Sequence, residues 1–85
     1  MQVTFSPQAK DDLDYWLTNN KTTAKKIVQL IEDIQQNPFV GIGKPEPLKH
    51  QLSGFWSRRI NRKHRLIYQV YENEIFIFSA KGHYF

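Results

Sequence analysis

The chain has 85 residues and no cysteine, so it can bury only a modest core and has neither disulfides nor thiolate metal ligands to support it. Twelve lysines and arginines against eight aspartates and glutamates give a formal net charge of +4. There is no basic and apolar leader and no apolar run of about 18 residues. We therefore expect one cytoplasmic domain over residues 1–85, with no membrane partner.

The N-terminal half predicts a short strand at about residues 3–5 and then two helices. Ser6 and Pro7 are typical of an N-cap and a first helical position. The first helix should end near Asn19 and bury an apolar face consisting of Ala9, Leu13, Trp16 and Leu17, with Asp11, Asp12 and Asp14 mostly on the other side. The second should run from Thr22 or Thr23 to Asn37-Pro38 and bury Ile27, Leu30, Ile31 and Ile34.

Residues 37–50 predict a long loop that carries a candidate functional carboxylate. Three prolines and two glycines exclude regular periodicity. Two of the prolines flank Glu46 and restrict its backbone. Because a loop this long in a small domain is usually functional or disordered, Glu46 is a candidate site residue.

The remaining residues predict three antiparallel strands, at about 55–60, 64–71 and 75–81. We expect three-residue turns at 61–63 and 72–74. This second turn places Phe76 and Phe78 on the helix-packed face, whereas a two-residue turn would place them among the arginines. The predicted fold class is α+β, with two N-terminal helices packed on one face of a twisted antiparallel sheet.

Cationic side chains gather in the middle of the chain and on one face of the predicted sheet. The segment from residue 44 to residue 65 holds one acid, Glu46, and seven basic residues, which are Lys44, Lys49, Arg58, Arg59, Arg62, Lys63 and Arg65. In the predicted register Arg59 lies opposite Arg65, and such opposed like charges are destabilising unless an anion offsets them. His83 falls on the same face. The pattern favours a polyanion such as nucleic acid, and a solvated face that only aids solubility is the alternative.

These residues match the needs of metal-free RNA cleavage. The reaction requires a base for the 2′-hydroxyl, a cation for the phosphate charge and an acid for the leaving 5′-oxygen. Glu46 is the candidate base, Arg65 the stabilising cation and His83 the acid, because an unperturbed imidazole has a pKa of about 6.5. His64 and His50 compete for the acid role, but His64 falls on the packed face and His50 follows the loop.

Other chemistries find less support. Three scattered histidines without ligand spacing argue against a metal site, so we expect no metal and no cofactor. No Gly-x-Ser-x-Gly motif supports a serine hydrolase. Tyr84 fits stacking on a base and plain packing equally well, whereas Trp56 favours the core. Gly82, directly before His83, permits additional backbone freedom.

Several segments together resemble the YoeB toxin family of the RelE superfamily, and the similarity extends over nearly the whole chain. They are Gly43-Lys44-Pro45-Glu46-Pro47-Leu48-Lys49, Leu52-Ser53-Gly54-Phe55-Trp56-Ser57-Arg58-Arg59-Ile60, His64-Arg65-Leu66-Ile67-Tyr68 and His83-Tyr84. The resemblance implies a microbial RNase-like, RelE-type fold. It also implies the toxin of a type II toxin-antitoxin module, one that cleaves messenger RNA in the A site of the 70S ribosome and blocks translation.

The same resemblance implies roles for individual residues and for partners. Glu46 corresponds to the general base, Arg65 to the phosphate stabiliser and His83 to the general acid. Lys49 and Arg59 correspond to phosphate-binding residues, and Tyr84 to a base-contacting aromatic. The product would be a 2′,3′-cyclic phosphate, formed without a cofactor. A YefM-type antitoxin would be the partner, and a homodimer remains open.

Two alternatives retain the fold and change the function. ParE-type toxins bind DNA gyrase and lack this glutamate, arginine and histidine set. A noncatalytic RNA-binding module would use the basic face alone. Mutation of Glu46 and His83 separates these functions from the enzyme.

Overall fold

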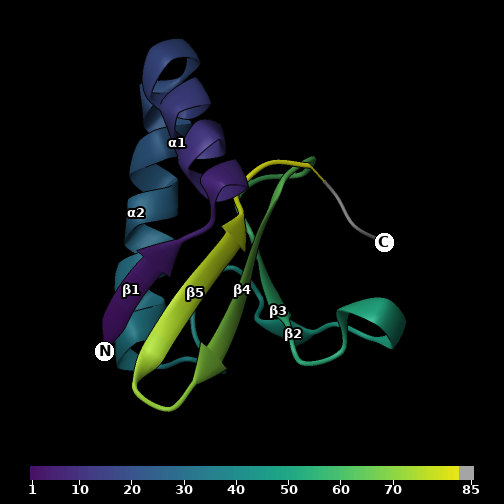
Figure 1. Ribbon diagram of the computed structural model, residues 1–85. Helices are drawn as coiled ribbons and strands as arrows, with labels where there is room; N and C mark the ends of the chain where they lie inside the picture. Colours follow the sequence, from purple (N-terminus) through teal and green to yellow (C-terminus); the bar gives the residue numbers. More distant parts are fainter. Residues whose placement is uncertain (83–85) are drawn as a thin grey trace.

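The computed structural model describes residues 1–82. Helices α1 (Pro7–Asn19) and α2 (Lys21–Gln36) follow strand β1 (Gln2–Phe5). The second half of the chain forms β2 (Glu46–Pro47), a short 3₁₀ helix η1 (His50–Leu52), β3 (Trp56–Arg59), β4 (Arg65–Tyr71) and β5 (Glu74–Ser79). Both helices lie on one side of the sheet (Figure 1), which confirms the predicted α+β class. Neither helix of residues 1–82 is long and apolar enough to span a membrane.

The five strands form one sheet in the order β1-β5-β4-β3-β2. Strands β3, β4 and β5 pair antiparallel, as predicted, and β2 also pairs antiparallel with β3, but β1 joins the edge of β5 in parallel. The sheet is therefore mixed and not wholly antiparallel. The local pattern of β1 does not encode this direction, because its partner lies at the other end of the chain. Glu46 and Pro47, predicted within a loop, add a two-residue strand to the opposite edge.

Both helices begin at side-chain caps. The Ser6 hydroxyl accepts a hydrogen bond from the Ala9 amide (3.0 Å) and donates one to the Phe78 carbonyl (2.6 Å), so it also ties α1 to β5. The Asn20 side chain accepts from the Thr23 amide at 3.1 Å. Helix α2 therefore begins at Lys21, slightly earlier than predicted, because Asn20 provides the cap that was not recognised.

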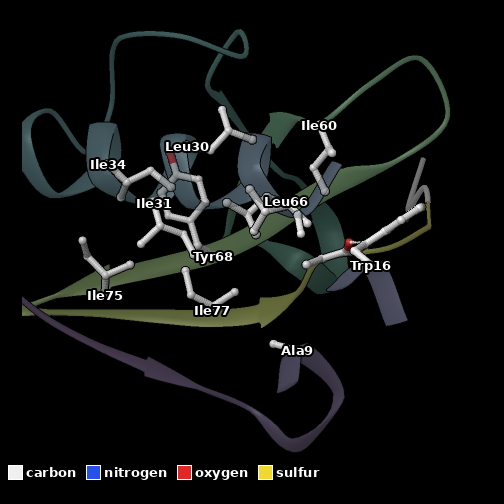
Figure 2. Packing of buried hydrophobic residues seen from close by; sticks show 13 residues of the cluster. Ala9, Trp16, Leu30, Ile31, Ile34, Ile60, Leu66, Tyr68, Ile75 and Ile77 are labelled. Carbon is white, nitrogen blue, oxygen red and sulfur yellow. Dashed lines mark hydrogen bonds between the residues drawn. The ribbon is translucent and has the colours of Figure 1, made fainter. Parts of the chain in front are cut away.

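The core lies between the helices and the sheet, with Tyr68 near the centre of the cluster (Figure 2). All four residues predicted to face inward from α2 are buried. On α1 the prediction fails at two positions. Leu17 is 49% exposed, whereas Asp12 is only 4% exposed. Asp12 is buried because its carboxylate accepts a hydrogen bond from the Ala80 amide at 2.9 Å, a long-range contact that helical periodicity cannot reveal.

The turn between β4 and β5 differs from the prediction. Tyr71 pairs with Glu74, so the turn has two residues, and Ile75 and Ile77 face the core in place of Phe76 and Phe78. A register shift between Ile67/Tyr68 and their partners marks a β-bulge that leaves Phe78 unpaired. Both faces of β5 are apolar, and hydrophobic alternation therefore could not determine its register. The predicted three-residue turn at 61–63 is confirmed by the Arg59–Arg65 pairing.

Candidate active site

Backbone pairing assigns Glu46, Arg59 and Arg65 to the face of the sheet that points away from the helices. Glu46 is paired with Ser57, and Arg59, two residues further along β3, is directly opposite Arg65. Directly opposed residues share a face, as do residues two apart along a strand. Standard strand spacing gives about 12 Å between the Cα atoms of Glu46 and Arg65, a gap that long side chains and a bound phosphate can bridge. The predicted arginine register is confirmed.

The segment that carries Glu46 is anchored on both sides. The Gly43 carbonyl accepts a hydrogen bond from the Arg59 amide at 2.7 Å, and the Leu48 amide donates to the Phe55 carbonyl at 2.9 Å. The Leu48 side chain is buried, while Glu46 is exposed. The carboxylate is thus accessible, and its backbone is held against the edge of β3.

A hollow of about 610 Å³ opens beside this segment and is lined by residues 46–52. Glu46 and Lys49 both contribute to its wall, which gives the hollow one negative and one positive side chain from the predicted set. Arg59 and Arg65 are not among its lining residues. The structure therefore places Lys49 with Glu46 in this hollow, and it places the two arginines on the adjoining sheet face.

Arg65 is held by its own turn and pairs with no carboxylate in residues 1–82. Its Nη1 donates to the Asn61 carbonyl at 2.9 Å and to the His64 carbonyl at 3.1 Å. Arg59 is exposed and also lacks an acidic partner within the described residues. Two neighbouring guanidinium groups with no acidic partner among residues 1–82 favour binding of an anion such as phosphate, for which the arginine fork is well shaped.

Arg58 belongs to the basic segment 44–65 of the sequence but not to this basic surface. Its side chain is fully buried and points toward the helices, where it forms an ion pair with Asp33 of α2. It also donates hydrogen bonds to loop carbonyls and to the Tyr68 hydroxyl; the carbonyls are those of Asn37, Val40 and Ile42. The hydrogen bond from Arg58 holds the pKa of the Asp33 carboxyl below its usual 3.8. Arg58 thus organises the loop ahead of Glu46 instead of contacting a ligand.

His64 lies against the helices, as predicted, but it has a further contact that we did not foresee. Its ring packs edge-to-face on Trp16 with centroids 4.9 Å apart, and its Nδ1 accepts a hydrogen bond from the Gly82 amide at 2.9 Å. Burial lowers the pKa of His64 below 6.5, and the positive charges of Lys81, Lys63 and Arg65 lower it further.

Gly82 is held by its neighbours, contrary to the expected backbone freedom. Its carbonyl accepts from the Arg65 amide at 2.9 Å, while its amide donates to His64. Its φ of +93° lies in the region that favours glycine, so the residue type is suited to this turn. His83 and Tyr84 lie outside the described residues, and their predicted roles stay predictions.

Aromatic side chains extend the candidate site along the same face of the sheet. The Phe78 ring lies 5.2 Å from that of Phe55 and 6.5 Å from that of Phe76. The sequence prediction had placed Phe76 and Phe78 in the core, so it missed this cluster. Phe55 directly precedes β3, and alternation along this strand puts it on the same side as Arg59. This alternation is the sequence signal that could have revealed the aromatic cluster.

Comparisons with known proteins agree with this arrangement. Helices cover one face of a mixed sheet, with paired arginines and an exposed carboxylate on the other, and solved bacterial toxins share this fold. A family model described as YoeB-like toxin of bacterial type II toxin-antitoxin system matches residues 5–84. Toxin YoeB of Escherichia coli K12 is 49% identical over 84 residues, which cover 99% of this chain and all of the relative.

Two solved structures from Staphylococcus aureus are also similar. A YoeB dimer superposes with a TM-score of 0.92 at 50% identity, covering 99% of this chain and 98% of the other. A YoeB-YefM complex gives a TM-score of 0.91 at 52% identity with the same coverage. This chain belongs to the YoeB family of type II toxins.

Proposed function

We propose that the protein is a ribosome-dependent endoribonuclease that cuts messenger RNA in the A site of the 70S ribosome and thereby blocks translation. The observation that carries this proposal is the shared sheet face of Glu46, Arg59 and Arg65 in a chain of this toxin family. An exposed carboxylate and two arginines without acidic partners among residues 1–82 suit a single RNA phosphate and the hydroxyl beside it.

The proposed reaction needs no metal. Glu46 takes the proton from the 2′-hydroxyl, the 2′-oxygen attacks the adjacent phosphorus, and the bond to the 5′-oxygen breaks. Arg65 stabilises the charge that develops on the phosphate oxygens, and His83 protonates the leaving 5′-oxygen. The products are a 2′,3′-cyclic phosphate and a free 5′-hydroxyl. Among residues 1–82, no three histidine or carboxylate side chains gather closely enough to hold a metal ion.

Other residues of the set bind the RNA. Lys49, in the wall of the hollow with Glu46, and Arg59, opposite Arg65, hold phosphates of the substrate. Tyr84 contacts a base. In the cell, a YefM-type antitoxin binds the toxin and restrains it, by analogy with the Staphylococcus aureus complex, and the toxin forms a homodimer, as that relative does.

Cleavage of messenger on purified 70S ribosomes tests this function. Glu46→Gln and Arg65→Met should each lower kcat by about 10²-fold to 10⁴-fold, because each removes a group required in the transition state. His83→Ala should also be impaired. Arg62→Met is the matched control: Arg62 is an exposed arginine in the turn after β3, and its loss should change the rate by no more than about threefold.

The results also separate the alternatives. Full cleavage by Glu46→Gln would exclude the proposed mechanism. Ribosome binding without cleavage by the wild type would favour a noncatalytic RNA-binding module. Inhibition of DNA gyrase supercoiling would favour a ParE-like toxin. The position of Glu46 on the same sheet face as Arg59 and Arg65 does not support that alternative. Detection of the 2′,3′-cyclic phosphate end would establish the attack by the 2′-hydroxyl.

A further inference from the structure

We propose that His64 is a positioning residue for the cleavage reaction: its neutral imidazole holds the backbone of Gly82 and so sets the direction in which the chain continues to the general acid. This inference rests on the proposed function. The contact is specific, because the Gly82 amide donates to Nδ1 of His64 at 2.9 Å while the Gly82 carbonyl accepts from the Arg65 amide at 2.9 Å. Both polar groups of this peptide backbone are therefore fixed, one on each side of its Cα.

The residues just before Gly82 are anchored as well. The Ala80 amide donates to the buried carboxylate of Asp12 at 2.9 Å, and the Ala80 carbonyl accepts from the Trp16 indole at 2.9 Å. The chain after β5 (the yellow end of the sequence in Figure 1) thus runs between α1 and the turn from β3 to β4. Four hydrogen bonds from two directions thus hold Ala80 and Gly82. Of these, only the bond to His64 involves a group that titrates near neutral pH.

Trp16 links the two halves of this anchor. Its indole N–H is bound to Ala80, and its ring supports the imidazole at 4.9 Å in an edge-to-face arrangement. Helix α1 therefore orients His64 as well as the backbone at Ala80. The imidazole is half-buried, which limits the ring positions from which Nδ1 can reach the Gly82 amide.

Protonation would remove the acceptor. A doubly protonated imidazole carries N–H groups on both nitrogens, so Nδ1 would oppose the Gly82 amide instead of accepting from it. The charged groups around His64 come from every neighbouring element: Asp12 on α1, Lys63 in the turn, Arg65 on β4 and Lys81 after β5. Burial and the three cations lower the pKa of His64, whereas Asp12 raises it. The neutral form is therefore present at pH 7.

Two substitutions of His64 that match each other in shape isolate the role of the hydrogen-bond acceptor. In His64→Asn, the side-chain oxygen can occupy the position of Nδ1 and accept from Gly82 without titrating. His64→Leu has the same branched shape and no acceptor. At pH 7.5 we expect His64→Asn to retain kcat within about threefold, and His64→Leu to lose about tenfold to hundredfold in kcat with KM nearly unchanged, because a small displacement of a catalytic group is that costly. The melting temperatures of both variants should be measured to show that both fold.

The pH profile gives a second readout that a purely structural role would not change. The ratio of wild-type kcat to that of His64→Asn should be near one at pH 7.5 and should fall as the pH drops through the pKa of His64, which is lowered from 6.5 and can be located by NMR titration of the ring, since only the wild type loses its acceptor. Taking the ratio cancels titrations that both proteins share. A ratio independent of pH, or equal kcat for the Asn and Leu variants, would overturn the positioning role.

Hydrogen exchange of the Gly82 amide separates this proposal from the enzymatic one. In the free protein at pH 7.5, the amide should exchange at least about tenfold faster in His64→Leu than in His64→Asn or the wild type. Equal exchange in all three would refute the contact itself. If the exchange differs as expected but the wild type cuts no messenger on ribosomes, the contact is upheld and the endoribonuclease function is refuted.

Discussion

Replacement of Arg58 by methionine should cost about 3 to 4 kcal/mol of unfolding free energy. Methionine preserves much of the buried volume, so the loss reports on the polar network and not on a cavity. The guanidinium binds Asp33, the Tyr68 hydroxyl and three loop carbonyls, which are those of Asn37, Val40 and Ile42. Removing one partner of a buried ion pair typically costs about 3 to 5 kcal/mol.

The lower part of that range applies here. The Asp33 side chain is 26% exposed, so water can replace part of what Arg58 supplied. The loop residues that offer carbonyls are also mostly exposed. A domain of this length has a total stability on the order of 4 to 13 kcal/mol, so the predicted loss is at least about a quarter of it.

Urea unfolding followed by tryptophan fluorescence measures this change. Arg59→Met is a matched control one residue away, since Arg59 is exposed and lies opposite another arginine. It should change the unfolding free energy by no more than about 0.5 kcal/mol in either direction. A loss below about 1 kcal/mol for Arg58→Met, or equal losses for the two variants, would refute the assignment of Arg58 as the organiser of the loop.

Three further outcomes follow from the same contacts. The pKa of Asp33 is lowered in the folded state, so the ionised carboxylate stabilises the fold fully above about pH 4. This stabilisation is lost as the pH falls through the pKa of Asp33 in the folded protein. The melting temperature should therefore drop more on acidification in the wild type than in Arg58→Met. Gly41→Ala should destabilise the fold, because Gly41 has φ of +132° and a Cβ there would lie 2.0 Å from Asp33 Oδ2; an unchanged denaturation midpoint would contradict this. Asp12→Ala should cost about 1 to 3 kcal/mol by leaving the buried Ala80 amide without its acceptor, and stability equal to that of an exposed-site control, Asp11→Ala, would count against it.

The sequence by itself was sufficient for the helical hairpin, the α+β class and the register of β3 on β4. Periodicity identified the buried face of α2, and the three-residue turn at 61–63 brought Arg59 opposite Arg65. These features depend on residues that are close along the chain, where turn length and the alternation of side chains leave few possibilities. The candidate carboxylate, Glu46, was recognised for the same reason, because its flanking prolines are local.

Contacts between distant segments needed the tertiary structure. The adjacent residues Arg58 and Arg59 are chemically identical, and only the packing of α2 on β3 buries the first with Asp33 while the second stays exposed. The same holds for β5, which has two apolar faces and whose register depends on a bulge. The attachment of Gly82 to His64 joins residues 18 positions apart, so it depends on how the strands and α1 converge and not on any local pattern.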